Sequence, residues 1–230
     1  MLIGGNMLVK FIHHSCFTIE LEDNFLVFDY FGKGNLRLPR DKKVYFISSH
    51  RHADHFDRVI FDYDAKCYIL SDDIEVDSSF PKNIRLVKPQ DEIELDDLKL
   101  HFEESTDEGV LLSLEVEKRH ILFAGDHNWW VWDRYSKEEH ERMEIWFKGE
   151  VDKFKKENFD LVMAPVDPRM KDAYWLAGDY YIKTLRPKHF FPMHMWGEFS
   201  ISEKFKNKLQ SDYDFCQIHV IKNDGQEFEI

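Results

Sequence analysis

Short hydrophobic runs separated by turn residues dominate the first half of the chain. The run at 44–48 is apolar and typical of a buried strand, whereas residues 16–21 partly alternate, as in a half-exposed strand. Residues 110–116 and 120–124 have the pattern of a hairpin whose turn is Glu117-Lys118-Arg119. The pattern predicts strands at 8–13, 16–21, 25–30, 44–48, 67–70, 84–87, 93–95, 98–103, 110–116 and 120–124, and a short helix at 56–63.

The second half changes to a helical period. Ser136 and Glu139 have the spacing of a capping box, and the apolar positions behind them recur at helical spacing, which indicates a core-facing stripe. Strands are predicted at 159–164, 189–193, 215–221 and 227–229, and helices at 171–185 and from Ser200, with Glu203 as a second capping box, to about residue 210. We therefore expect one domain over residues 1–230, with two packed sheets and helices outside.

Composition narrows the function classes. The 230 residues are 43% hydrophobic, which is enough for a substantial core, and the net charge of −13 argues against nucleic acid and anionic membrane surfaces as partners. Three cysteines without a C-x-x-C pair are typical of reduced core residues. No basic and apolar leader and no long apolar run occurs, so we expect a cytoplasmic protein that acts on a small molecule; the sequence does not indicate its oligomeric state.

The loop after the strand at 44–48 holds the densest candidate chemistry. His50, His52, Asp54 and His55 lie within six residues of one another. Imidazole and carboxylate are ligands for zinc or a similar divalent ion. His50 and His52 can share one ion if the loop is extended, while Asp54 and His55 point elsewhere and suit a second ion. The alternative is a solvated His-rich loop.

Three later strands repeat this arrangement. Apolar runs end in Gly125-Asp126, in Pro165-Val166-Asp167 and in Pro192-Met193-His194. Singly, each polar residue is equally well explained as a cap or a hydrogen-bonded side chain. Four strands that all end in a ligand-type residue favour one metal site at a common sheet edge.

The ordered motifs His50-x-His52-x-Asp54-His55, Gly125-Asp126 and Pro192-x-His194 resemble the metallo-β-lactamase superfamily. His14-Ser15-Cys16-Phe17 and Phe28-Asp29 are similar to the opening strands of its cytosolic, lactonase-like branch of metal-dependent hydrolases. The resemblance implies an α/β fold, a four-layer αββα sandwich. It also implies that His50 and His52 bind a first metal, that Asp54, His55 and His194 bind a second, and that Asp126 bridges them.

One departure from the family pattern concerns the first metal. The family usually supplies a third histidine about twenty residues before the bridging aspartate, but residues 104–109 contain none. Asp107 is the candidate substitute; otherwise it is only a turn residue. The cofactor is therefore expected to be one or two divalent ions, with zinc favoured and manganese or iron made more suitable by added oxygen ligands.

Three residues are candidates for catalysis. Asp54 would orient the nucleophile, and His127 would donate to a developing oxyanion or assist a proton transfer, or else simply pack beside Trp129. Arg169 would hold a carboxylate or phosphate, or else form a surface salt bridge. The tryptophans of residues 129–132 line a pocket or fill the core.

These features predict a metal-dependent hydrolase that uses a metal-bound hydroxide on a small anionic ester, lactone or phosphodiester. The alternatives are a non-catalytic or redox metal-binding protein on the same scaffold, or a degenerate fold that binds a partner. The resemblance defines the machinery and leaves the substrate open.

Overall fold

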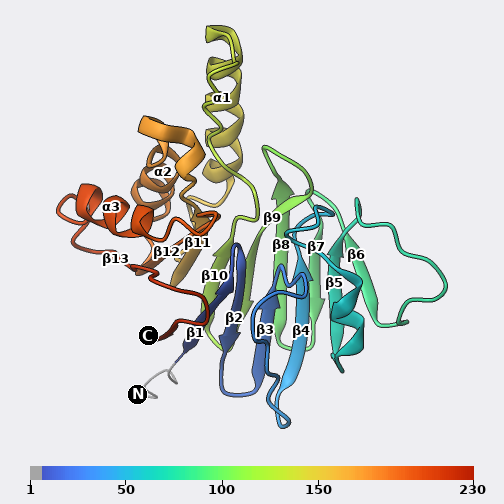
Figure 1. Cartoon of the computed structure of the whole chain (residues 1–230). Helices are drawn as coiled ribbons and strands as arrows, with labels where there is room; N and C mark the ends of the chain where they lie inside the picture. Colours follow the sequence, from blue (N-terminus) through green and yellow to red (C-terminus); the bar gives the residue numbers. More distant parts are fainter. Residues whose placement is uncertain (1–6) are drawn as a thin grey trace.

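The computed structural model describes residues 7–230, which form two seven-stranded sheets (Figure 1). The first sheet has the order β14-β1-β2-β3-β4-β5-β6 and the second the order β13-β12-β11-β10-β9-β8-β7. The first sheet contains β14 (Glu227–Glu229), β1 (Leu8–His13), β2 (Cys16–Glu20), β3 (Asn24–Phe28), β4 (Lys43–Ser48), β5 (Cys67–Ser71) and β6 (Ile84–Val87). The second contains β13 (Gln217–Ile218), β12 (His189–Met193), β11 (Leu161–Pro165), β10 (Arg119–Phe123), β9 (Val110–Val116), β8 (Leu98–Glu104) and β7 (Glu92–Leu95).

Each sheet is antiparallel on one side and parallel on the other. Strands β3 to β6 run parallel in the first sheet, and β10 to β13 run parallel in the second. Parallel strands deliver their carboxyl ends to one edge of a sheet. The loops after β3, β4, β10, β11 and β12 therefore leave from the sheet edges that carry the candidate ligands.

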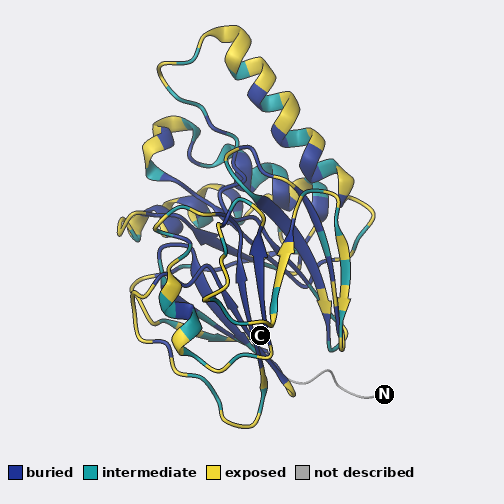
Figure 2. Ribbon diagram, turned by 90° about the vertical axis from the view of Figure 1, so that its right-hand side faces the viewer, coloured by how far each residue is buried: buried dark blue, intermediate teal, exposed yellow. Residues whose placement is uncertain are grey.

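Side chains alternate between two cores along the first sheet. On β4, Tyr45 and Ile47 face the core shared with the second sheet, while Val44 and Phe46 face a smaller outer cluster. Ile60 of the short 3-10 helix η1 (Arg58–Asp62) joins this outer cluster. The central strands β2 to β5 of this sheet are buried on both faces, whereas its edge strands β6 and β14 are partly exposed (Figure 2 colours buried residues dark blue).

The α-helices lie beside the β10 to β13 side of the second sheet (Figure 1). They are α1 (Lys137–Lys153), α2 (Leu176–Leu185) and α3 (Ser200–Leu209), and all three contribute side chains to the large hydrophobic cluster that also contains the residues between the sheets. With η1 and loops over the first sheet, this arrangement confirms the predicted αββα sandwich, in which the layer on the η1 side is thin.

The local predictions differ from the structure mainly around the helices. The capping box of Ser136 and Glu139 is present, but Ser200 is the first residue of α3 and Phe199 occupies the N-cap without a side-chain hydrogen bond. The predicted helix at 171–185 is replaced by the end of the 3-10 helix η2 (Pro168–Ala173), inside which Lys171 has a left-handed φ of 51°, and by α2, which begins only at Leu176. A single left-handed residue interrupts the helical hydrogen-bond pattern.

Candidate metal centre

Two glycines bring the loops of the two sheets together. A Cβ on Gly109 would lie 2.0 Å from the carbonyl oxygen of Ser49, and a Cβ on Gly125 would lie 2.7 Å from the Ser49 side chain. Both glycines also have positive φ, 68° and 52°. Only glycine satisfies both requirements, so the loops carrying Asp107 and Asp126 can press against the end of β4.

The first ligand group gathers His50, His52, Asp107 and Asp126. One donor atom from each lies within 4.8 Å of all the others. The Nε2 atom of His50 is 3.0 Å from Nδ1 of His52 and 3.8 Å from Oδ2 of Asp126. The structure thus places Asp107 beside the two histidines, where the missing third histidine would be expected.

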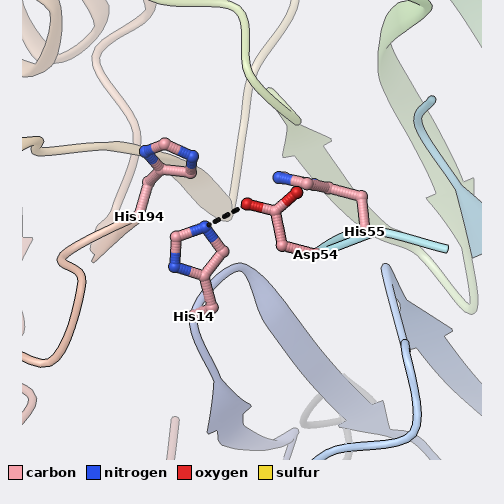
Figure 3. A group of neighbouring side chains, drawn as sticks. All are labelled: His14, Asp54, His55 and His194. Atoms are coloured by element: carbon pink, nitrogen blue, oxygen red, sulfur yellow. Dashed lines mark ion pairs between the residues drawn. The ribbon is translucent and has the colours of Figure 1, made fainter. Parts of the chain in front are cut away.

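The second ligand group contains His14, Asp54, His55 and His194 (Figure 3). The turn between β1 and β2 supplies His14, the loop after β4 supplies Asp54 and His55, and the end of β12 supplies His194. Nε2 of His14 lies 3.3 Å from Oδ2 of Asp54. Four side chains from three distant segments converge on one volume, and their imidazole and carboxylate donors are ligand types for zinc and similar ions.

Asp126 connects the two groups. Its Oδ1 lies 3.1 Å from Nε2 of His55, and its Oδ2 lies 3.2 Å from Nε2 of His194 and 3.8 Å from Nε2 of His50. The carboxylate therefore faces one histidine of the first group and two of the second. This is the position of a bridging ligand between two ions.

The donor atoms of this cluster fit a cation better than they fit one another. Within the described part of the chain, Nε2 of His14, Nε2 of His55 and Oδ1 of Asp126 are buried without a hydrogen-bond partner. Unpaired buried polar atoms cost free energy, and a metal ion would satisfy them. Asp107 also fits a cation site. Burial and the nearby Asp126 carboxylate raise the pKa of Asp107, so its charged form is disfavoured unless a positive charge lies nearby.

Two buried aspartates orient the histidines of the second group. Asp29 accepts hydrogen bonds from Nδ1 of His55 at 2.6 Å and from the backbone N–H and hydroxyl of Ser49, both at 2.7 Å. Asp167 accepts from Nδ1 of His194 at 2.9 Å. With Nδ1 protonated, each Nε2 is left as a lone-pair donor that points into the cluster.

Protonation in the cluster follows its charges. Burial, together with the neighbouring His55, lowers the pKa of His50 to about 3, so its imidazole is neutral, as a metal ligand must be. Burial also acts to lower the pKa of His194, but Asp126 and Asp167 outweigh it and raise the pKa to about 9. A metal ion must therefore displace a proton from His194.

A cavity of about 300 Å³ opens over this cluster, and we call it the arginine pocket. Its upper wall is formed by Trp130, Trp132, Arg134, Arg169 and Trp196. Asp167 accepts from Nε and Nη2 of Arg169 in a bidentate pair, which fixes the guanidinium. The same guanidinium lies 4.6 Å from the ring centre of Trp196 and 5.2 Å from that of Trp132. Arg134 and Arg169 thus line the same cavity as residues of both ligand groups.

His127 does not face this pocket, contrary to the prediction that it donates to an oxyanion. The side chain is fully buried and stacks on Phe147, with ring centres 4.9 Å apart. Its Nδ1 accepts from the backbone N–H of Thr106, and its Nε2 donates to the carbonyl of Phe147. Burial lowers the pKa of His127 to about 3. With both nitrogens used by the backbone, His127 is a packing residue.

Sequence reasoning assigned no metal role to His14 and no orienting role to Asp29. A signal for Asp29 was available, since it follows an apolar strand in the same way as Asp126 and Asp167. His14 has a weaker signal, because it lies in a two-residue turn with a φ of 56°. Of the tryptophans expected to line a pocket or fill the core, Trp130 and Trp132 line the arginine pocket, whereas Trp129 packs against Phe147.

Comparison with known proteins gives the family. Residues 8–194 match the beta-lactamase superfamily domain, and the chain belongs to this family. The match covers both ligand groups. No sequence among curated proteins matches the chain.

Several solved structures share the fold at low sequence identity. The metallo hydrolase Igni18 from the archaeon Ignicoccus hospitalis has a TM-score of 0.69 and 16% identity, over 98% of both chains. The isothiocyanate hydrolase from Delia radicum gut bacteria has a TM-score of 0.59 and 16% identity, over 97% of this chain and 100% of that one. The diiron β-hydroxylase CmlA from Streptomyces venezuelae has a TM-score of 0.63 and 8% identity, over 100% of this chain and 54% of that one.

These structures support the fold, and two of the three are named hydrolases. The third is named a diiron enzyme. Within residues 7–230, no helix combines the length and the apolar character needed to cross a membrane.

Proposed function

We propose that the protein is a metal-dependent hydrolase that cleaves a small anionic ester, lactone or phosphodiester. The observation that carries this proposal is the pair of ligand groups joined by Asp126 at the floor of an open pocket. A structural metal site is closed, whereas a catalytic one keeps a position open to substrate.

The donor sets suggest which residues hold the ions. His50, His52 and Asp107 would hold the first, His14, Asp54, His55 and His194 the second, and Asp126 would bridge. The second set is rich in imidazole and suits zinc, while the additional carboxylate of the first also suits manganese or iron. When bound, the ions supply a hydroxide nucleophile near neutral pH and polarise the oxygen of the scissile group.

The surrounding residues orient the reactants. The His14 imidazole, whose Nε2 lies 3.3 Å from Oδ2 of Asp54, holds the pKa of Asp54 far below its usual range, so the carboxylate stays ionised and can accept a hydrogen bond from the attacking nucleophile. Asp29 and Asp167 keep His55 and His194 in the tautomer that presents Nε2. These groups are fixed before substrate arrives, which reduces reorganisation during the reaction.

The arginine pocket favours an anionic substrate. Arg134 and Arg169 both line its wall, and the carboxylates that line it belong to the ligand groups, where bound ions would balance their charge. Arg169 uses Nε and Nη2 on Asp167 and is stacked among tryptophans, so it can offer its remaining N–H donors with little loss of side-chain entropy. A carboxylate or phosphate on the substrate matches this fork.

Metal content and hydrolysis test the proposal together. Elemental analysis of the untagged protein should find up to two equivalents of metal, and a panel of anionic esters, lactones and phosphodiesters should contain a substrate. His52→Ala should reduce hydrolysis at least a hundredfold and lower the metal content. His101→Gln, on β8 and paired with Glu103, is the matched control and should change neither. Full hydrolysis by metal-depleted His52→Ala would contradict the proposal. A fully loaded native protein that hydrolyses none of the panel would instead favour a redox or binding role.

A further inference from the structure

A second cavity shares Trp196 with the arginine pocket. It measures about 230 Å³, and we call it the aromatic pocket because Phe11, Phe31 and Phe199 line it. Trp196 and Asp54 line both cavities. The two cavities therefore share a ligand of the second group and the indole of Trp196.

The Trp196 side chain is held in place at a cost to the backbone. Its φ is 53°, a conformation that bulky residues rarely adopt, and His194 and Gly197 on either side also have positive φ. The indole lies 4.7 Å from the ring centre of His14 and 5.4 Å from that of His194. The guanidinium of Arg169 covers it at 4.6 Å. Strained conformations persist where the surroundings impose them, and they concentrate at functional sites.

The second ligand group is accessible from both cavities. His14 and Asp54 line the aromatic pocket, while Asp54 and His194 line the arginine pocket. A substrate whose reacting atom sits at this group can thus extend one arm into each cavity. The two arms meet different chemistry, since one cavity presents guanidinium groups and the other presents mainly aromatic rings.

Apart from His14 and Asp54 of the second ligand group, the polar residues of the aromatic pocket are already partnered or are solvent-facing. Nδ1 of His13 lies 2.8 Å from a carboxylate oxygen of Asp224, and Lys33 is an exposed residue whose ammonium lies 5.7 Å from the ring centre of Phe31. Among the described residues at this cavity, these groups leave the aromatic rings as the main contact surface. The volume is below the roughly 300–1,000 Å³ of pockets for drug-sized ligands, so it suits a single ring or a short alkyl chain.

We propose that the aromatic pocket binds the apolar alcohol portion of the substrate while the arginine pocket binds its anionic acyl portion. This inference rests on the proposed hydrolase function. The predicted substrate class is an ester between an anionic acid and a ring-sized apolar alcohol. Water adds across the acyl C–O bond: the hydroxyl goes to the acyl carbon, the bond to the alcohol oxygen breaks, and that oxygen takes the proton.

Binding of two probes tests the division without requiring turnover. Benzyl alcohol represents the apolar arm and succinate the anionic arm, and saturation-transfer NMR on the metal-loaded protein measures their dissociation constants. Saturating succinate should change the benzyl alcohol dissociation constant less than twofold, because the probes occupy different cavities. Displacement of benzyl alcohol by succinate would overturn the inference.

Substitutions at Lys33 and Trp196 separate the two cavities. Lys33→Trp fills the aromatic pocket from an exposed position and should weaken the binding of benzyl alcohol at least tenfold without affecting the binding of succinate. Lys33→Ala is the control and should keep both dissociation constants within twofold of the native values. Trp196→Gly suits the positive φ and should weaken both probes, because the indole lines both cavities. Native benzyl alcohol affinity in folded Lys33→Trp would overturn the inference.

A matched pair of substrates then connects binding to turnover. Monobenzyl and monomethyl succinate share an acyl group and release alcohols of similar acidity, so their kcat/KM ratio reports the alcohol contact. The native enzyme should prefer the benzyl ester at least tenfold, and Lys33→Trp should abolish the preference. Equal kcat/KM values for the two esters in the native enzyme would overturn the inference while leaving the hydrolase function intact. If neither ester nor any member of the wider panel is hydrolysed, the proposed function fails instead.

Discussion

Asp29→Asn is the most informative single substitution, because it changes one atom and leaves the shape of the buried site intact. The wild-type carboxylate accepts three hydrogen bonds: Oδ1 accepts from the Ser49 backbone, and Oδ2 accepts from the Ser49 hydroxyl and from Nδ1 of His55. An asparagine must keep its oxygen towards the Ser49 N–H, since its amide group would otherwise face another donor. The amide N–H₂ then faces His55.

The consequence is a change of tautomer at His55. An amide donor at this position requires Nδ1 of His55 to accept, so the ring proton moves to Nε2, the atom that lies 3.1 Å from Asp126. A protonated Nε2 cannot bind a metal ion. Loss of such an orienting carboxylate reduces metal affinity about 10- to 100-fold, which is about 1.4 to 2.8 kcal/mol of binding free energy.

The assay is a competition for metal against a chromophoric chelator, with thermal unfolding followed in parallel. Asp160→Asn is the matched control, because Asp160 is also a buried carboxylate. It accepts from the His120 backbone and from Lys188, outside both ligand groups. The control should lose stability and keep its metal affinity. Native metal affinity in a folded Asp29→Asn variant would refute the tautomer argument and the assignment of His55 as a ligand.

Two further substitutions test the structural account. Gly109→Ala would place a Cβ 2.0 Å from the Ser49 carbonyl oxygen, so it should displace the Asp107 loop and lower the metal content. Gly149→Ala is the control, because open space surrounds this position, and it should keep the native metal content. Equal metal content in both variants, measured by elemental analysis, would contradict this account. The pKa of His127 is about 3 in the folded protein and about 6.5 when unfolded, so the unfolded chain binds the extra proton between these values. The contribution of His127 to the free energy of unfolding should therefore be fully present above about pH 6.5. Below that pH it should fall by about 1.4 kcal/mol per pH unit. Urea unfolding with EDTA at several pH values should show a shallower slope for His127→Gln, and an unchanged slope would exclude the buried neutral imidazole.

Local chemistry determined much of the fold from sequence. Strands such as β1, β9 and β12 were predicted with their observed bounds, since a period of two or an unbroken apolar run is a local property of the chain. The helix at 171–185 was predicted too long, because the left-handed residue Lys171 has no signal in the apolar pattern. Ser200 was predicted as a cap from its spacing to Glu203, but the preceding chain is already turned into the helical region at Phe199.

Most of the candidate ligands could be predicted from sequence, whereas His14 was found only in the structure. His50, His52, Asp54 and His55 are adjacent in sequence, and Asp126 and His194 each end an apolar strand, so sequence pattern alone predicted them. His14 could be added only after the β1–β2 turn was placed against β12, where the backbone N–H of His194 donates to the carbonyl of His14. Tertiary packing also excludes His127 as a catalytic residue, because only the packed structure shows that backbone groups use both of its nitrogens.

The amino-acid sequence by itself determined the alternation of strands, the family and the chemistry available at the ends of the strands, because these depend on residue type and spacing. The tertiary structure alone decided which side chains share a volume: the glycine contacts at Ser49, the bridging position of Asp126 and the place of Trp196 in the walls of both cavities. These features depend on distances between segments far apart along the chain, which no local pattern of residues encodes.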